Sequence, residues 1–537
     1  MVAGPTLPLL IANATVDQVM RSMFDDTFAG IHQLAWLDWA ILIPYYTLLL
    51  ILSIYGLHRY AVIRTYRKWR RNTIIEPAAR FESLPPVTIQ LPIYNERFVI
   101  ERLLEEVVKM DYPVHLLQIQ VLDDSTDETH AFTERLVGAY RAQGIPIEYH
   151  HRSNRLGFKA GALEAGSKTA TGELIAIFDA DFVPPRDFLQ RTVHFFTDPK
   201  IGVVQTRWTY LNRHFNLLTE VQAMLLDGHF VLEHEARCGR GLFFNFNGTA
   251  GVLRKSMIED AGGWQHDTLT EDTDLSYRAQ LKGWRFLYLP DVECPSELPV
   301  ETHSFQVQQS RWAKGLMQVG IKLLPSILRA KLPWRVKMEA FCHLTPNISY
   351  PLMLAVSALT LPVSIVRFYM GWYQMLILDL PLVVANFLSL MLFYAYAQRE
   401  LDPRGWKRSL PLLPVLMAAG VAITVSNAKA VLEALLGIRS GFVRTAKYAI
   451  TGEGRATPPA SRYRRRSGWL PWVELAVGCW FVYVIAYSIE CYNFFAIPFL
   501  LLFVCGYWWA GFTTMYQEYR GRLAWERERG LGVETVR

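Results

Sequence analysis

Cysteine, net charge and a glycine-rich nucleotide motif are scarce or missing in this chain. Its six cysteines are scattered along 537 residues without a Cys-x-x-Cys pair, so neither a disulfide framework nor a zinc site is predicted. No GxGxxG sequence follows the first predicted strand, which weakens a dinucleotide-binding interpretation. The formal charge of +6 is too small to indicate nucleic-acid binding. No basic segment precedes an apolar core at the N-terminus, so no cleaved signal peptide is expected, and residues 1–35 are interpreted as an N-terminal interfacial segment.

Apolar residues, by contrast, are abundant. Hydrophobic residues make up 51% of the chain and charged residues 19%, which is typical of a membrane protein with a soluble part. Residues 36–58 are almost wholly apolar and long enough to cross a bilayer. The basic flank 59–71 follows, and the positive-inside rule places it in the cytoplasm. Further spans are predicted at 343–366, 376–397, 470–490 and 494–515, which makes five.

Residues 409–436 are ambiguous. They are apolar to Val425 and then polar, and two preceding spans already return the chain to the cytoplasm. Because the arginine-rich loop 437–468 should also be cytoplasmic, residues 409–436 are expected to lie at the interface, to re-enter, or to form a tight hairpin. The C-terminal tail 517–537 is likewise expected inside.

Between the first two spans the pattern changes to short strands that alternate with helices. Apolar strand patterns at 87–91, 117–122 and 174–178 predict a mostly parallel, doubly wound α/β sheet. Beyond it, apolar residues from Leu316 to Ile327 recur at helical spacing opposite lysines. That pattern fits a helix lying in the membrane surface, and almost equally a helix packed on the soluble domain.

Carboxylates follow two of these buried strands. Asp179 and Asp181 come directly after Leu174–Phe178, and the period of a strand would point both side chains the same way. Two carboxylates on one side can hold Mg²⁺ or Mn²⁺ together with a phosphorylated ligand, although Asp is also common in turns. Asp124 follows the second strand and could accept a hydrogen bond from a nucleobase or ribose, or form an Asx turn. Tyr94 and Glu96 close the first strand and could flank the same pocket.

Three further polar clusters each have a functional and a purely structural interpretation. Lys159 opens a helix rich in small residues and could neutralise a phosphate, or remain a solvated lysine. Glu271 and Asp272 could supply a general base or cap a helix. Arg311 suits a pyrophosphate and Trp312 a sugar face, but an Arg-Trp pair is also common at a membrane boundary.

The order of these clusters is more specific than any one of them. The chain resembles the membrane-embedded, processive family 2 glycosyltransferases, which include the cellulose, hyaluronan, chitin and mannan synthases. Within that group it is most similar to the cellulose synthase-like mannan, glucomannan and glucan synthases. The resemblance is dense over residues 85–320 and rests on the segments 121–127 (VLDDSTD), 157–163 (GFKAGAL), 178–182 (FDADF), 204–208 (VQTRW), 246–251 (FNGTAG) and 308–312 (QQSRW).

The resemblance implies a GT-A-like domain and a role for each matching residue. Asp124 and Lys159 would hold the nucleoside, Asp179 and Asp181 the diphosphate and metal, Asp272 would be the general base, and Gln308, Arg311 and Trp312 would bind diphosphate and the acceptor end. Phe442, Thr445 and Lys447 match the FxVTxK gating loop of cellulose synthases, with Arg444 in place of Val. The Phe-Asn-Gly-Thr stretch departs from the Phe-x-Cys-Gly-Ser of cellulose synthases, which weighs against cellulose as the product. The expected parts are a transmembrane helix (36–58), the GT-A-like domain (80–305), interfacial helices with QxxRW (306–340), transmembrane and interfacial helices (341–436), a gating-type loop (437–468), two transmembrane helices (469–516) and a tail (517–537).

The predicted function is that of an inverting glycosyltransferase in a multi-pass membrane protein, in the inner membrane if bacterial. It would use UDP-glucose or GDP-mannose with Mg²⁺ or Mn²⁺ to elongate a β-linked mannan, glucomannan or glucan at the cytoplasmic face, with coupled translocation. One alternative is single-sugar transfer to a lipid acceptor such as a ceramide or polyprenyl phosphate. Another is a catalytically inactive membrane scaffold that binds nucleotide sugar. Donor, linkage, product length, oligomeric state and accessory subunits stay open.

Overall fold

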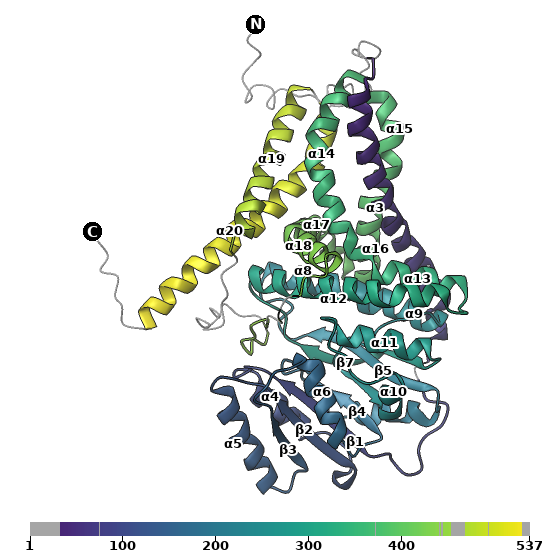
Figure 1. The fold of residues 1–537 in the computed structure, drawn as a ribbon, viewed down its shortest axis with the longest axis vertical. Helices are drawn as coiled ribbons and strands as arrows, with labels where there is room; N and C mark the ends of the chain where they lie inside the picture. The colour runs from purple at the N-terminus through teal and green to yellow at the C-terminus, as the bar shows by residue number, and fades with distance from the viewer. Residues whose placement is uncertain are drawn as a thin grey trace. The chain divides into compact units, whose positions relative to one another are not determined.

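The computed structural model describes residues 33–74, 76–370, 372–439, 441, 444–452, 468–491 and 493–528. The chain divides into two units (Figure 1). The sheet unit comprises residues 62–347 and 433–463, and the helical unit comprises residues 1–61, 348–432 and 464–537. Each unit is discontinuous in sequence, so segments far apart in the chain meet in the same fold.

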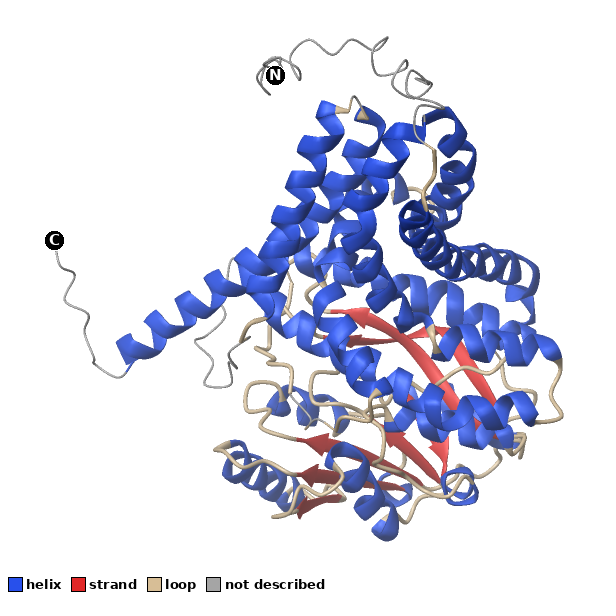
Figure 2. Ribbon diagram, turned by 45° about the horizontal axis from the view of Figure 1, so that its top comes forward, coloured by secondary structure: helices blue, strands red, loops and turns tan. Residues whose placement is uncertain are grey.

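Among the described residues, seven strands form one sheet in the sheet unit. Figure 2 draws the strands in red. They are β1 (Val87–Ile93), β2 (Leu117–Asp123), β3 (Ile147–His151), β4 (Leu174–Ile177), β5 (Ile201–Tyr210), β6 (Gly251–Arg254) and β7 (Arg285–Ser296). The order is β3-β2-β1-β4-β6-β5-β7, and only β6 runs antiparallel, to both β4 and β5. The α/β prediction is confirmed, with one reversed strand that the mostly parallel pattern did not indicate.

Both faces of the sheet are buried, which explains why its strands are nearly continuous apolar runs. In β4, Leu174 and Ala176 belong to the core on one face, while Ile175 and Ile177 belong to the core on the other. The helices of the sheet unit between β1 and β7 are α4 (Ile100–Val107), α5 (Thr129–Ala142), α6 (Phe158–Thr169), α7 (Phe188–Thr192), α8 (Leu217–Asp227), α9 (His234–Arg240), α10 (Lys255–Asp260) and α11 (Glu271–Leu281). A π-helix, Gly228–Glu233, joins α8 to α9.

The sheet unit ends in α12 (Thr302–Arg329) and α13 (Trp334–Leu344). The apolar face of α12 packs inside this unit, where Val319 and Ile327 share a core with Tyr277 of α11 and Leu344 of α13. The sequence allowed a helix lying in the membrane surface or one packed on the soluble domain. These contacts are those of a helix packed on the soluble domain. Lys314 is buried and pairs with Glu433 at 2.7 Å, so it does not form part of a solvated basic face.

The helical unit contains the long apolar segments. Its elements are α3 (Trp36–Trp69, which continues into the sheet unit), α14 (Ser349–Met370), α15 (Trp372–Val383), α16 (Ser389–Leu401), α17 (Leu413–Ala422), α18 (Thr424–Leu435), α19 (Leu470–Glu490) and α20 (Ile497–Glu528). Among the residues that the structure describes, five helical stretches are long and apolar enough to cross a membrane: 36–72, 346–368, 378–401, 470–490 and 494–523. Residues 406–422 and 424–435 form a pair bent by 43°, as in a broken span or a re-entrant loop. The chain is therefore a multi-pass membrane protein.

Candidate active site

One cavity of the sheet unit collects the predicted site residues. It lies beyond the carboxyl ends of β1, β2, β4 and β7, where an open α/β sheet binds its ligand. Thirteen of the fourteen predicted residues line it: Tyr94, Glu96, Asp124, Lys159, Asp179, Asp181, Glu271, Asp272, Gln308, Arg311, Trp312, Thr445 and Lys447. The fourteenth, Phe442, lies outside the described residues.

The two carboxylates after β4 are each held by a different lysine. Asp179 Oδ1 accepts a hydrogen bond from Lys159 Nζ at 2.5 Å, and Asp181 Oδ2 accepts one from Lys447 Nζ at 2.7 Å. β4 ends at Ile177, so Asp179 and Asp181 lie beyond the strand, and both line the same cavity. Burial raises the pKa of Asp179 against the opposing effect of Lys159. Burial acts to lower the pKa of Lys159, but the nearby carboxylates outweigh it and raise that pKa.

The predicted general base stands at the start of α11. Asp272 Oδ1 accepts a hydrogen bond from the Thr273 backbone N–H at 2.7 Å, which leaves Oδ2 for a second partner. Burial and the adjacent Glu271 carboxylate raise the pKa of Asp272 to about 7. Burial also raises the pKa of Glu271. An acid that titrates near neutral pH is suited to take a proton from a hydroxyl group.

Gly248 makes room for this base. It has a φ of +80°, and a Cβ placed on it would lie 2.9 Å from Asp272 Oδ2 and 3.5 Å from Lys159 Nζ. Its carbonyl oxygen accepts a hydrogen bond from Lys159 Nζ at 2.9 Å. The loop between α9 and β6 thus touches both the base and the lysine that holds Asp179.

Asp124 is engaged at the opposite end of the cavity. Its two oxygens accept hydrogen bonds from Arg152 Nε at 2.7 Å and Nη2 at 2.5 Å. Beside it, the Arg155 guanidinium lies 3.2 Å from the centroid of the Tyr94 ring. Arg155 lines the cavity but was not predicted as a site residue, because it precedes the Gly157–Leu163 motif by two positions.

Residues 444–447 close another side of the cavity. Arg444 donates to Glu96 through Nε at 2.9 Å and Nη2 at 2.7 Å. Burial raises the pKa of Glu96 to about 7, although Arg444 acts to lower it. Lys447, besides pairing with Asp181, donates to the Glu297 backbone oxygen. Arg444 was read only as a departure from the FxVTxK pattern, yet here it is the partner of a predicted site residue.

Gln308, Arg311 and Trp312 all come from α12. Burial lowers the pKa of Arg311 from its usual value, while Glu271 and Asp179 oppose that effect. A guanidinium stays charged under these conditions. Its fork of donors can therefore face a diphosphate in a cavity that is otherwise rich in carboxylates.

Part of the chain is similar in sequence to known glycosyltransferases. The model of Glycosyl transferase family group 2 matches residues 174–397. Over these residues the chain is similar to the family 2 glycosyltransferases. Glucomannan 4-beta-mannosyltransferase 1 of Oryza sativa subsp. japonica is 42% identical over 275 residues, which cover 50% of this chain and 53% of that protein. Glucomannan 4-beta-mannosyltransferase 2 of Arabidopsis thaliana is 43% identical over 254 residues, 46% of this chain and 48% of that protein. The chain spans about half the length of the curated relatives it matches.

The solved structures are more distant from this chain in sequence. The mannosyltransferase PcManGT from Pyrobaculum calidifontis, in complex with GDP-Man and Mn²⁺, is 23% identical with a TM-score of 0.48, over 64% of this chain and 99% of that one. S. aureus TarS 1–349 is 16% identical with a TM-score of 0.36, over 66% of this chain and 92% of that one.

Two of the motifs behind the resemblance contribute cavity residues to which no role was assigned. Trp208 comes from the end of β5 and Asn247 from the loop before β6, and both line the same cavity. The signal that could have found them was their position inside the VQTRW and FNGTAG motifs.

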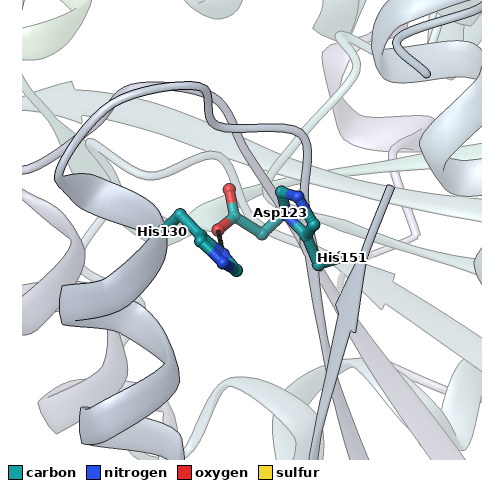
Figure 3. Close-up of side chains that lie close together, drawn as sticks. All are labelled: Asp123, His130 and His151. Atoms are coloured by element: carbon teal, nitrogen blue, oxygen red, sulfur yellow. Dashed lines mark ion pairs between the residues drawn. The ribbon is translucent and has the colours of Figure 1, made fainter. Parts of the chain in front are cut away.

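A separate polar cluster lies at the end of β2. Figure 3 shows Asp123 between His130 and His151, side-chain types that can bind a transition metal. The Tyr149 hydroxyl donates to Asp123 Oδ2 at 2.6 Å and lies 2.5 Å from His130 Nδ1. Tyr149 thus bridges Asp123 and His130 at the end of the strand that Asp124 directly follows.

Proposed function

We propose that this glycosyltransferase moves a hexosyl unit from a nucleoside-diphosphate sugar to the end of a growing β-linked polysaccharide, with inversion at the anomeric carbon. The supporting observation is that a base titrating near neutral pH, a carboxylate pair and a buried arginine line one cavity. Between the two donors considered, GDP-mannose is favoured because the relatives reported above are named as mannosyltransferases. A mannan or glucomannan is the corresponding product.

The carboxylates after β4 fit a divalent cation. Asp179 and Asp181 offer oxygen ligands, the type that Mg²⁺ and Mn²⁺ prefer. Both line the cavity together with Arg311, so a diphosphate placed against the guanidinium lies within reach of the same carboxylates. A bound Mg²⁺ or Mn²⁺ would offset negative charge on the departing diphosphate.

The chain's own residues account for the remaining chemistry. Asp272 accepts the proton of the acceptor hydroxyl, whose oxygen then attacks the anomeric carbon from the face opposite the nucleotide. Arg311 donates hydrogen bonds to the diphosphate as its charge develops. The Trp312 indole offers an apolar face against which the acceptor sugar packs. Gly248 leaves the space beside Asp272 in which the hydroxyl must lie.

The basic flank 59–71 supports a cytoplasmic position for the catalytic domain. Five spans and one bent helix pair supply a membrane part through which the product could leave as it is made. These two features support the proposal that synthesis takes place at the cytoplasmic face with coupled export.

The function is tested by incubating the purified protein with GDP-mannose or UDP-glucose and Mg²⁺ or Mn²⁺. We expect release of GDP and a polymer that a β-mannanase digests, with neither formed by Asp272→Asn. A product limited to one sugar on a lipid would overturn the polymerase proposal in favour of the lipid-acceptor alternative. Failure to release a nucleoside diphosphate from either donor would overturn the transferase assignment.

A further inference from the structure

Two histidines hold the side chain of Asn247, a cavity residue without an assigned role. His229 Nε2 lies 3.2 Å from Asn247 Oδ1, and His234 Nε2 lies 2.7 Å from Asn247 Nδ2. Asn245 Nδ2 donates to Asn247 Oδ1 at 2.9 Å. The carboxamide is therefore contacted from three directions on the protein side of the cavity.

The surrounding network decides which way this amide points. Asn245 Nδ2 also donates to the Phe246 backbone oxygen at 3.2 Å, so its nitrogen faces Asn247 and the nearer Asn247 atom must be an acceptor. Asn247 Nδ2 then donates to His234 Nε2, and His229 Nε2 donates to Asn247 Oδ1. Both lone pairs of Oδ1 are used, whereas Nδ2 keeps one further N–H.

The two histidines are themselves fixed. His229 lies in the π-helix, a feature that recurs at functional sites, and its Nδ1 is 3.0 Å from Glu233 Oε2. Burial acts to raise the pKa of Glu233, but Arg237 and His229 outweigh it and hold that pKa well below its usual range. His234 is fully buried, and burial holds its pKa well below the usual range, so the ring is neutral and its Nε2 can accept.

The network uses one N–H of Asn247 Nδ2 and leaves the second for a further acceptor. Asn247 lines the cavity and directly precedes Gly248, which lies against Asp272. We propose that His229 and His234 are positioning residues that fix Asn247 as a hydrogen-bond donor to an oxygen of the sugar bound beside Asp272. This inference rests on the proposed function, because it presumes that a sugar occupies that part of the cavity. Neither histidine is among the cavity-lining residues, so they act through Asn247.

The two ring nitrogens of His229 can be tested separately. In His229→Gln the amide nitrogen takes the place of Nε2, so the contact to Asn247 is kept. In His229→Asn the amide nitrogen takes the place of Nδ1, so only the contact to Glu233 is kept. We expect His229→Gln to stay within about threefold of the wild-type kcat. We expect His229→Asn to lose about 10-fold in kcat, the effect of one hydrogen bond made in the transition state. The melting temperatures of the two full-length variants should agree within a few degrees.

A double-mutant cycle isolates the path through Asn247. In an Asn247→Ala background we expect His229→Asn to change kcat by less than twofold, because the group it positions is gone. Equal kcat losses for His229→Gln and His229→Asn would overturn the proposal, as would a full 10-fold loss in the Asn247→Ala background. These outcomes require an active wild-type protein, so a wild type that consumes no nucleotide sugar would instead count against the proposed function.

Discussion

The ionisation of Asp272 should set the acidic limb of the pH–rate profile, and Glu271→Gln should move that limb to lower pH. Burial and then the Glu271 carboxylate raise the Asp272 pKa to about 7 from its ordinary value of 3.8. Only the ionised carboxylate can accept the proton of the acceptor hydroxyl. Activity of the wild type should therefore rise with pH through about 7, and removing the neighbouring negative charge should make Asp272 a stronger acid.

The size of the expected shift in the Asp272 pKa depends on how much of its rise comes from burial and how much from Glu271. Burial is the larger cause and remains in the variant, so we expect the Asp272 pKa to fall by ~1 unit, or ~1.4 kcal/mol in the free energy of ionisation. At about pH 6, an acid with a pKa of about 7 is roughly one-tenth ionised, and one with a pKa of about 6 is half ionised. Relative to its own maximum, the variant should therefore be about fivefold faster than the wild type at that pH.

The assay is the release of nucleoside diphosphate, measured as kcat/KM for the donor between about pH 5 and pH 9. The variant's maximal rate can differ without affecting the test, since the midpoint of the limb is the quantity compared. Glu164→Gln on the exposed side of α6 makes the same change in charge away from the cavity and should leave the midpoint in place. A midpoint that is unchanged or raised in Glu271→Gln would refute this account of Asp272.

Three further substitutions test other parts of the site. Asp181→Asn removes a predicted cation ligand and should raise the Mn²⁺ concentration for half-maximal activity by ~10-fold or more, measured by metal titration. Arg311→Lys keeps the charge but not the two-pronged donor geometry, and kcat should fall by ~10²-fold in a steady-state assay. Gly248→Ala should lower kcat by ~10²-fold because a Cβ would lie 2.9 Å from Asp272 Oδ2. Gly241→Ala, also at positive φ but with nothing within 4 Å of its Cβ, should cost ~1 kcal/mol in the free energy of unfolding by chemical denaturation and leave kcat unchanged.

The composition of the cavity could be predicted because its residues follow the ends of strands. Tyr94, Asp124 and Asp179 come shortly after β1, β2 and β4, and parallel strands that are neighbours in one sheet end at the same edge. Alternation and apolar runs identify such strands without any knowledge of their partners. Predicting that these three residues lie together therefore required only local sequence patterns and the rule that open sheets bind ligands at the carboxyl ends of their strands.

The partners of these residues could not be predicted in the same way. Lys447 and Asp181 form a pair although they are 266 positions apart, and Arg444 and Glu96 are 348 positions apart. A local sequence pattern cannot predict pairs at such separations. The reversal of β6 was missed for a related reason. A four-residue apolar strand looks the same in either direction, and its orientation is set by the loop that brings Gly248 to the base.

The same long-range pairs show how the charges of the cavity are balanced. Asp179 and Asp181 would repel each other if left bare, and each carries a lysine that neutralises it. A divalent cation on Asp181 would compete with Lys447 Nζ for the same carboxylate, which would release that ammonium group next to an incoming diphosphate. Lys447 belongs to the segment 444–447, in which Arg444 forms an ion pair with Glu96. If Lys447 left Asp181, the Arg444–Glu96 pair would still hold this segment to the cavity wall, as far as the described residues show. Because one carboxylate oxygen cannot serve two cations at full strength, a cation on Asp181 and the Lys447–Asp181 pair would weaken each other.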